Sequence, residues 1–92
     1  MREAKNYNEI LGAIAEAMFV CSNSILQIRI KHSDTINGVK TPLDDQHDLH
    51  FDIGIENKFE EKELEKVLVK LIELDCYGYE AHSYELLVID KA

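Results

Sequence analysis

Two stretches of this sequence alternate between apolar and polar residues, and this pattern constrains the fold more than any other feature. In residues 25–31 and again in residues 49–56, every second side chain is aliphatic or aromatic. A period of two is typical of a β-strand that buries one face and leaves the other in solvent. We therefore expect these two segments to pair in one sheet.

The turn between these strands creates a conflict of register. Asn-Gly at residues 37–38 is a strong hairpin signal, because both residues tolerate the positive φ of a type I′ turn. A turn centred there would place Ile28 opposite His47, whereas a slide of four residues pairs Ile28 with Phe51 and restores an apolar face. We expect a break around residues 42–46, with the Asn-Gly turn at the tip of a projecting ribbon.

Two helices are predicted on either side of these strands. Asn6 and Glu9 have the spacing of a capping box, so the first helix should begin near Tyr7. Asn57 and Glu60 repeat this spacing before the second helix. Apolar residues then recur at three- and four-residue steps, as on the buried stripe of a helix, through residues 10–21 and 64–72.

The C-terminal part of the chain contains four consecutive aliphatic residues, 86–89. Such a run indicates a strand at the centre of a sheet, covered on both faces. We expect residues 77–81 to form a further strand that pairs with residues 84–89.

These elements predict an α+β fold in the order α-β-β-α-β-β. The 92 residues suffice for a single domain, residues 1–92, with one core. The simplest architecture is a two-layer sandwich, in which an antiparallel sheet carries both helices on one face. The order is compatible with a ferredoxin-like fold whose first strand has been moved to the end of the chain.

The charge of the chain is concentrated in one segment. Residues 44–65 hold nine acidic residues and two lysines, so they contribute −7 to the net charge of −8. Nucleic-acid binding requires a positively charged surface, which this composition does not provide. We expect no direct binding to DNA or RNA.

No pattern in the sequence indicates catalysis or a cofactor. Neither a nucleophile elbow, a phosphate-binding glycine loop nor a metal-binding motif is present. Cys21 and Cys76 lack the spacing of a zinc site, and no apolar run is long enough to span a membrane. We therefore expect a non-enzymatic, cytoplasmic protein without a metal or cofactor.

The acidic segment favours a protein-interaction module that binds a basic surface of a protein partner. Such a module would act as an inhibitor or a nucleic-acid mimic, in the manner of phage anti-defence, antitoxin or immunity proteins. Aromatic side chains near the C-terminus add anchors of the kind found at interfaces. The predicted partner-binding residues are Asp44, Asp45, Asp48, Asp52, Glu56, Glu60, Glu61, Glu65, Tyr77 and Tyr79.

The alternative is a small regulatory or metabolic domain that binds a metal or small ligand through His47, His50 and Asp52. These residue types can ligate divalent metals, but their spacing matches no established metal motif, and solvated side chains on an exposed strand are the simpler interpretation. Under either hypothesis, a sheet covered on one face would expose apolar side chains, so we expect a homodimer or a partner-covered sheet.

Overall fold

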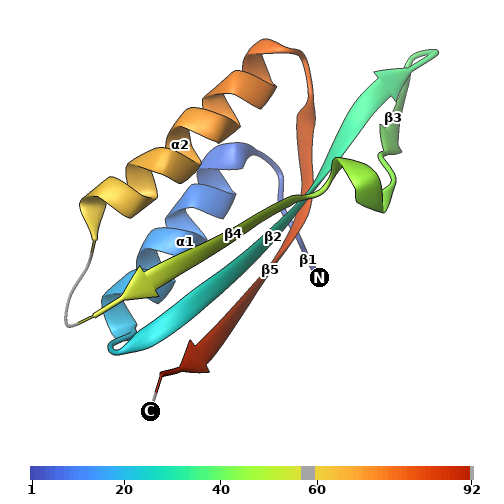
Figure 1. Ribbon diagram of the computed structural model, residues 1–92. Helices are drawn as coiled ribbons and strands as arrows, with labels where there is room; N and C mark the ends of the chain where they lie inside the picture. Colours follow the sequence, from blue (N-terminus) through green and yellow to red (C-terminus); the bar gives the residue numbers. More distant parts are fainter. Residues whose placement is uncertain (57–59, 92) are drawn as a thin grey trace.

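The computed structural model describes residues 1–56 and 60–91 and shows an α+β protein (Figure 1). Two helices are combined with a curled antiparallel sheet of five strands, which confirms the predicted α+β class. In chain order the elements are β1 (Arg2–Glu3), α1 (Tyr7–Val20), β2 (Ser24–Ile36), β3 (Val39–Pro42), the 3-10 helix η1 (Asp45–His47), β4 (Leu49–Ile55), α2 (Glu61–Cys76) and β5 (Glu80–Asp90).

The long strand β2 forms the centre of the sheet. β5 pairs with it along one side, and the short β1 pairs with the far side of β5. On the other side of β2, β4 pairs with its N-terminal half and β3 with its C-terminal end. β2 is thus hydrogen bonded to three strands, and η1 connects the two that share one of its sides.

The register between β2 and β4 confirms the predicted slide. Ile28 pairs with Phe51, and Leu26 pairs with Ile53. Because side chains alternate along a strand, this register places the apolar residues of both strands on one face. The neighbouring Arg29 pairs with His50 on the opposite face, which we call the open face of the sheet.

The predicted ribbon and its break are both present. Asn37 and Gly38 have φ values of 52° and 77° at the tip of the β2–β3 hairpin. Both values lie in the left-handed region that a type I′ turn requires. β3 ends at Pro42, and η1 takes up the four-residue slide before β4 begins at Leu49.

Helix α1 begins at Tyr7, as predicted. The side chain of Asn6 accepts a hydrogen bond from the backbone N–H of Glu9 at 2.9 Å. The Glu9 carboxylate in turn accepts from the N–H of Lys5, one residue before the position that a standard capping box uses.

Helix α2 begins at Glu61 and ends in a Schellman motif. The cap that we expected at Asn57 falls outside the described residues. At the C-terminal end, the N–H of Gly78 donates to the carbonyl of Asp75, and the N–H of Tyr79 donates to the carbonyl of Leu74. Gly78 has a φ of 89°, which a residue with a side chain rarely adopts.

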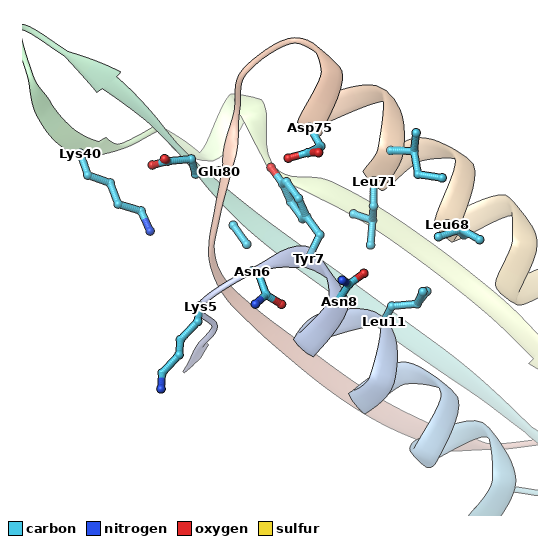
Figure 2. A pocket seen from close by; sticks show the side chains of 12 residues that line it. Lys5, Asn6, Tyr7, Asn8, Leu11, Lys40, Leu68, Leu71, Asp75 and Glu80 are labelled. Atoms are coloured by element: carbon cyan, nitrogen blue, oxygen red, sulfur yellow. The ribbon is translucent and has the colours of Figure 1, made fainter.

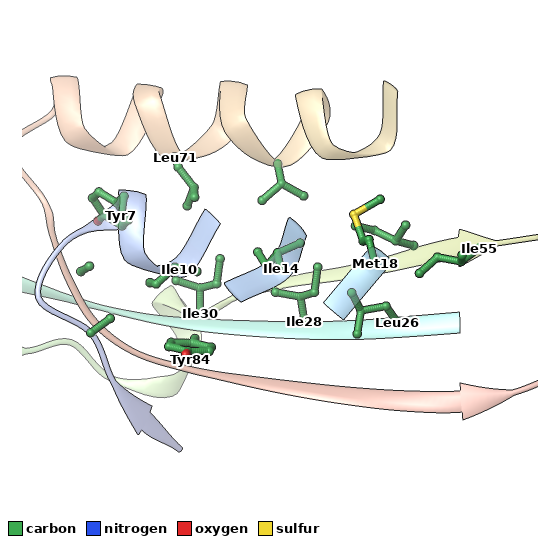
Figure 3. Packing of buried hydrophobic residues seen from close by; sticks show 14 residues of the cluster. Tyr7, Ile10, Ile14, Met18, Leu26, Ile28, Ile30, Ile55, Leu71 and Tyr84 are labelled. Carbon is green, nitrogen blue, oxygen red and sulfur yellow. The ribbon is translucent and has the colours of Figure 1, made fainter. Parts of the chain in front are cut away.

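The hydrophobic core lies between the helices and the covered face of the sheet (Figure 3). In this view α1 lies between α2 and the strands. The fully buried side chains of α1 and β2 interdigitate there, and Val67 and Leu71 close the core from α2. The largest buried aliphatic residues are Ile10, Ile14, Met18, Leu26, Ile28, Ile30, Ile53 and Ile55.

The predicted strand over residues 84–89 is present, but the separate strand predicted over residues 77–81 is not. Residues 77–79 terminate α2 rather than forming a strand, and residues 80–90 form the single strand β5. Residues 86–89 are also not at the centre of the sheet, because β1 pairs only with Ser83 and Tyr84 of β5. They are not covered on both faces either, since Leu87, Val88 and Ile89 are 53%, 47% and 40% exposed. The observed order is β-α-β-β-β-α-β, and neither the two-layer arrangement nor the permuted ferredoxin-like order is confirmed.

Over the described residues, neither helix has the length and apolar character needed to cross a membrane.

Candidate functional site

The acidic residues that were predicted to bind a partner lie on three successive elements rather than in one cluster. In Figure 1, η1 and the beginning of α2 lie at opposite ends of β4. The first group surrounds η1 and consists of Asp44, Asp45 and Asp48. The second lies on and just after β4 and consists of Asp52 and Glu56, and the third begins α2 and consists of Glu60, Glu61 and Glu65.

Two carboxylates of the η1 group are paired with cations of β2. Both Nε and Nη2 of Arg29 lie 2.8 Å from Oδ2 of Asp48, whose side chain has no exposed surface. Nζ of Lys31 donates to Oδ1 of Asp45 at 2.9 Å, and this hydrogen bond lowers the pKa of Asp45. The charge of these two aspartates is therefore compensated within the chain.

The three residues of the alternative metal or ligand site are not brought together. Nδ1 of His47 lies 2.6 Å from Oδ1 of Asp44, within η1 and its cap. His50 and Asp52 instead lie on the open face, where they line a shallow depression of about 360 Å³ with side chains of β2 and β5. In the part of the chain that the structure describes, no three His, Cys, Asp or Glu side chains are placed to hold a metal ion.

The remaining acidic residues differ in their partners. The Glu56 carboxylate accepts a hydrogen bond from Nζ of Lys91 at 2.8 Å. Glu61 and Glu65 are exposed on the first turns of α2, and Glu60 occupies its N-cap position. Four of the predicted partner-binding carboxylates form no ion pair with a described residue: Asp52, Glu60, Glu61 and Glu65.

The two predicted aromatic anchors lie at the far end of α2 from Glu61. Tyr77 is the C-cap residue and is 73% exposed, while Tyr79 is half-buried in the Schellman motif. The acidic group and the aromatic pair are thus separated by the length of the helix.

A pocket that the sequence did not indicate lies between the start of α1, the end of α2 and the start of β5 (Figure 2). Its volume is about 250 Å³. The hydroxyl of Tyr7 points toward the carboxylate of Asp75 in Figure 2 and is hydrogen bonded to Nδ1 of His32 at 3.1 Å. Burial, together with the negative charges of Asp75 and Glu80, raises the pKa of Tyr7, so its hydroxyl stays protonated at neutral pH.

The histidine of this pair is fully buried beneath the sheet. Burial lowers the pKa of His32, so the imidazole is neutral at pH 7. The protonated phenol of Tyr7 and the neutral imidazole of His32 are joined by one hydrogen bond, and neither group is charged. The pair therefore contributes an uncharged hydrogen bond inside the core, beside the pocket.

The burial of His32, but not its contact with Tyr7, could be predicted from the sequence. His32 continues the inward-facing series of residues 26, 28 and 30, so the alternation alone places it under the sheet. Ser33 is buried as well, and next to it the pairing with β5 shifts between Lys31 and His32, where His82 is the extra residue on β5. A bulge of this kind depends on the partner strand and carries no signature in the local sequence.

The open face carries apolar side chains of β5 beside polar ones. Leu87 pairs with Gln27 of β2, and Ile89 pairs with Ile25. Leu87 and Ile89 are both exposed, and Glu85 lies across from Arg29 on the same face. This face thus combines a small apolar area with surrounding charges, which is the composition of many protein interfaces.

No protein-family model matches the chain, and no significant match is found among curated proteins or solved structures.

Proposed function

We propose that the protein is a non-enzymatic interaction module that binds a basic surface of a protein partner. The observation that carries this proposal is the set of exposed carboxylates that form no ion pair with any described residue, Asp52, Glu61 and Glu65, on β4 and the beginning of α2. Uncompensated charge of one sign accelerates the encounter with a surface of opposite charge.

The partner-binding residues are revised by the ion pairs around η1. Asp45 and Asp48 are engaged by Arg29 and Lys31, so they contribute less to an external field than the carboxylates of β4 and α2. An inhibitor or nucleic-acid mimic would present the latter carboxylates to the cations of a nucleic-acid site. Leu87 and Ile89 on the open face would add apolar contact area beside Asp52.

The alternative, a metal- or ligand-binding domain, is less well supported. His47 lies apart from His50 and Asp52 and is hydrogen bonded to Asp44. The pocket beside Tyr7 is lined by none of His47, His50 and Asp52.

The test compares proteins captured from a lysate by the native chain and by two charge-reversed variants. The first variant carries Asp52→Lys, Glu61→Lys and Glu65→Lys. The matched control carries Glu3→Lys, Asp75→Lys and Glu80→Lys, which make the same change in net charge at exposed carboxylates outside the proposed surface. Circular dichroism and thermal unfolding establish that both variants remain folded.

The proposal expects at least one captured protein to be lost with the first variant and retained with the control. For a nucleic-acid mimic, added duplex DNA should also displace that protein, and its capture should weaken with salt. If both variants lose the same proteins to the same extent, only total charge matters and the proposed surface is refuted.

A further inference from the structure

One edge of the sheet is only partly covered. β1 pairs with β5 at Ser83 and Tyr84 and extends no further. Within residues 1–56 and 60–91, no strand pairs with this side of residues 85–90 of β5. In Figure 1 this part of β5 forms the outer margin of the sheet. Such an edge presents backbone donors and acceptors that can accept a further strand.

Two hydrogen bonds establish which residues of β5 present their backbone at this edge. The N–H of Lys91 donates to the carbonyl of Asn23, so odd-numbered residues direct their N–H and C=O toward β2. The N–H of Ala4 donates to the carbonyl of His82, and β1 continues from this contact in unbroken register to Tyr84, so Tyr84 and the even-numbered residues after it direct theirs away from β2. By this alternation, Leu86, Val88 and Asp90 present N–H and C=O groups at the free edge.

The side chains at this edge are apolar and exposed. Leu87, Val88 and Ile89 retain about half of their surface in solvent. A groove between α1 and this stretch of β5 is lined in part by Ala17, Val20 and Leu86. Residues 86–89 of this edge carry none of the charges that usually prevent pairing with another chain.

We propose that the free edge of β5 binds the same edge of a second copy of this chain, forming a two-fold symmetric antiparallel dimer centred on Val88. This proposal does not rest on the acidic carboxylates of the surface proposed above, because it uses the opposite margin of the sheet from β4, although Leu87 and Ile89 would take part in both. Helices of both copies would lie on the same side of one continuous sheet.

The register follows from the backbone directions. In an antiparallel pair, residues directly opposite each other must both point toward the partner or both point away. This condition excludes the register that would place Glu85 opposite Asp90 of the second copy, because one is odd-numbered and the other even-numbered.

Among the registers that remain, centring on Val88 forms the most hydrogen bonds. Val88 then faces Val88 of the second copy, and Leu86 of each copy faces Asp90 of the other. Centring on Leu87 or Ile89 leaves fewer outward-facing residues opposite each other, and centring on Leu86 would require the place beside Tyr84 that β1 occupies.

The same register pairs complementary side chains on the open face. Leu87 lies opposite Ile89 of the second copy, and Glu85 lies opposite its Lys91, whose Nζ would exchange its contact with Glu56 of its own chain for one with Glu85. Each of these pairs occurs twice because of the symmetry. Opposite charges and aliphatic residues directly across two strands stabilise a sheet, whereas like charges at these positions oppose pairing.

The first experiment measures the mass of the untagged chain by sedimentation equilibrium from micromolar to submillimolar concentration. We expect a reversible dimer. Val88→Pro removes an N–H that faces the second copy and leaves the bonds to β2 in place, so it should yield a monomer with a native circular dichroism spectrum.

A second variant covers the case in which the proline disturbs folding. Leu87→Lys places two charges in the apolar centre of the dimer and should also yield a monomer. Val69→Lys is the control, since Val69 is 63% exposed but lies on α2, and it should leave the dimer intact. A native chain that is monomeric throughout, or a dimer that survives Leu87→Lys, would overturn the proposal.

A charge exchange tests the register itself. Glu85→Lys and Lys91→Glu should each weaken the dimer, by about 2- to 30-fold for two altered cross-strand pairs. The double variant should recover affinity, and a mixture of the two single variants should form a heterodimer in preference to either homodimer. If the double variant and the mixture show no recovery, the Val88-centred register is wrong.

Amide hydrogen exchange gives an independent readout for the same residues. The N–H groups of Leu86, Val88 and Asp90 should become protected as concentration rises, whereas those of Leu87 and Ile89 should be protected at every concentration. Protection that does not alternate in this way would contradict the proposed pairing.

Discussion

The guanidinium of Arg29 binds the carboxylate of Asp48 through two nitrogens at 2.8 Å, and the Asp48 side chain is entirely removed from solvent. This contact joins the open face of β2 to the residue that connects η1 with β4. The irregular segment between β3 and β4 is therefore fixed to the central strand by an ion pair as well as by its backbone.

Loss of the Asp48 carboxylate should destabilise the fold. Asp48→Ala removes the closest partner of Arg29. The guanidinium then loses its two charge-assisted hydrogen bonds to a buried carboxylate, which lowers the free energy of unfolding. We expect the urea midpoint to fall clearly further than for Asp44→Ala, which removes an exposed carboxylate of the same segment. Equal midpoints for the two variants would show that the buried pair does not hold η1 in place.

Two glycine-to-alanine substitutions should have opposite effects on stability. Gly12→Ala should stabilise the protein by about 0.5–1 kcal/mol, since Gly12 is in the interior of α1 and an added Cβ meets no atom within 4 Å. Gly78→Ala should destabilise it by about 1–2 kcal/mol, because Gly78 has a φ of +89° although its Cβ would also meet open space. Chemical denaturation of both variants measures the difference, and the same sign for both would contradict the conformational explanation.

The buried His32 should make stability depend on pH below neutrality. Burial lowers its pKa in the folded state, while the unfolded chain binds a proton near pH 6.5. Its contribution is complete above that pH and is lost progressively as the pH falls from about 6.5 toward the lower folded pKa. Urea midpoints from pH 7.5 to 5 should therefore decline, with a smaller slope for His32→Gln.

The pH range in which His32 affects stability is separate from that of Asp45. The hydrogen bond from Lys31 lowers the pKa of Asp45 in the folded state, so its contribution is present above about pH 4 and is lost only as the pH falls further. If His32→Gln retains the full slope between pH 7.5 and 5, other groups cause the decline.

The protein should not bind nucleic acid directly. Its net charge is −8, and two of its cations, Arg29 and Lys31, are engaged by Asp45 and Asp48. Random duplex DNA and single-stranded RNA should show no electrophoretic shift at physiological salt. A shift at that salt would count directly against a basic protein surface as the target.

The sequence predicted the pairing of β2 with β4 to the residue. This was possible because a one-residue slip would turn every side chain to the other face, and of the two registers compared only the slid one placed Ile28 opposite an apolar residue. The start of α1 was equally accessible, since the side chain of Asn6 forms the predicted cap through a local contact.

The exposure of β5 could not be predicted in the same way. Four consecutive aliphatics are consistent with a central strand, but burial depends on which segments lie beside them. The strand that partly covers β5 has only the two residues Arg2 and Glu3 and shows no recognisable pattern. The mistaken strand at residues 77–79 was avoidable, because Gly78 directly after a helical pattern is a common termination signal.

The candidate site was predictable in composition but not in its charge balance. The excess of carboxylates in residues 44–65 is evident from the sequence. Their compensation depends on η1, which brings Asp45 and Asp48 over the open face, where the alternation of β2 places Arg29 and Lys31. The three-residue 3-10 helix η1 thus determines which carboxylates remain available to a partner.

The position of β5 also has a consequence for synthesis of the chain. Its pairing partners Arg2 and Ser24 are made early, whereas β5 is made after all the other described strands. The central strand β2 therefore keeps an open side on the ribosome until β5 has emerged. Contacts between residues so far apart along the chain form slowly, so the nascent protein passes through a stage in which Leu26, Ile28 and Ile30 depend on the helices alone for cover on that side.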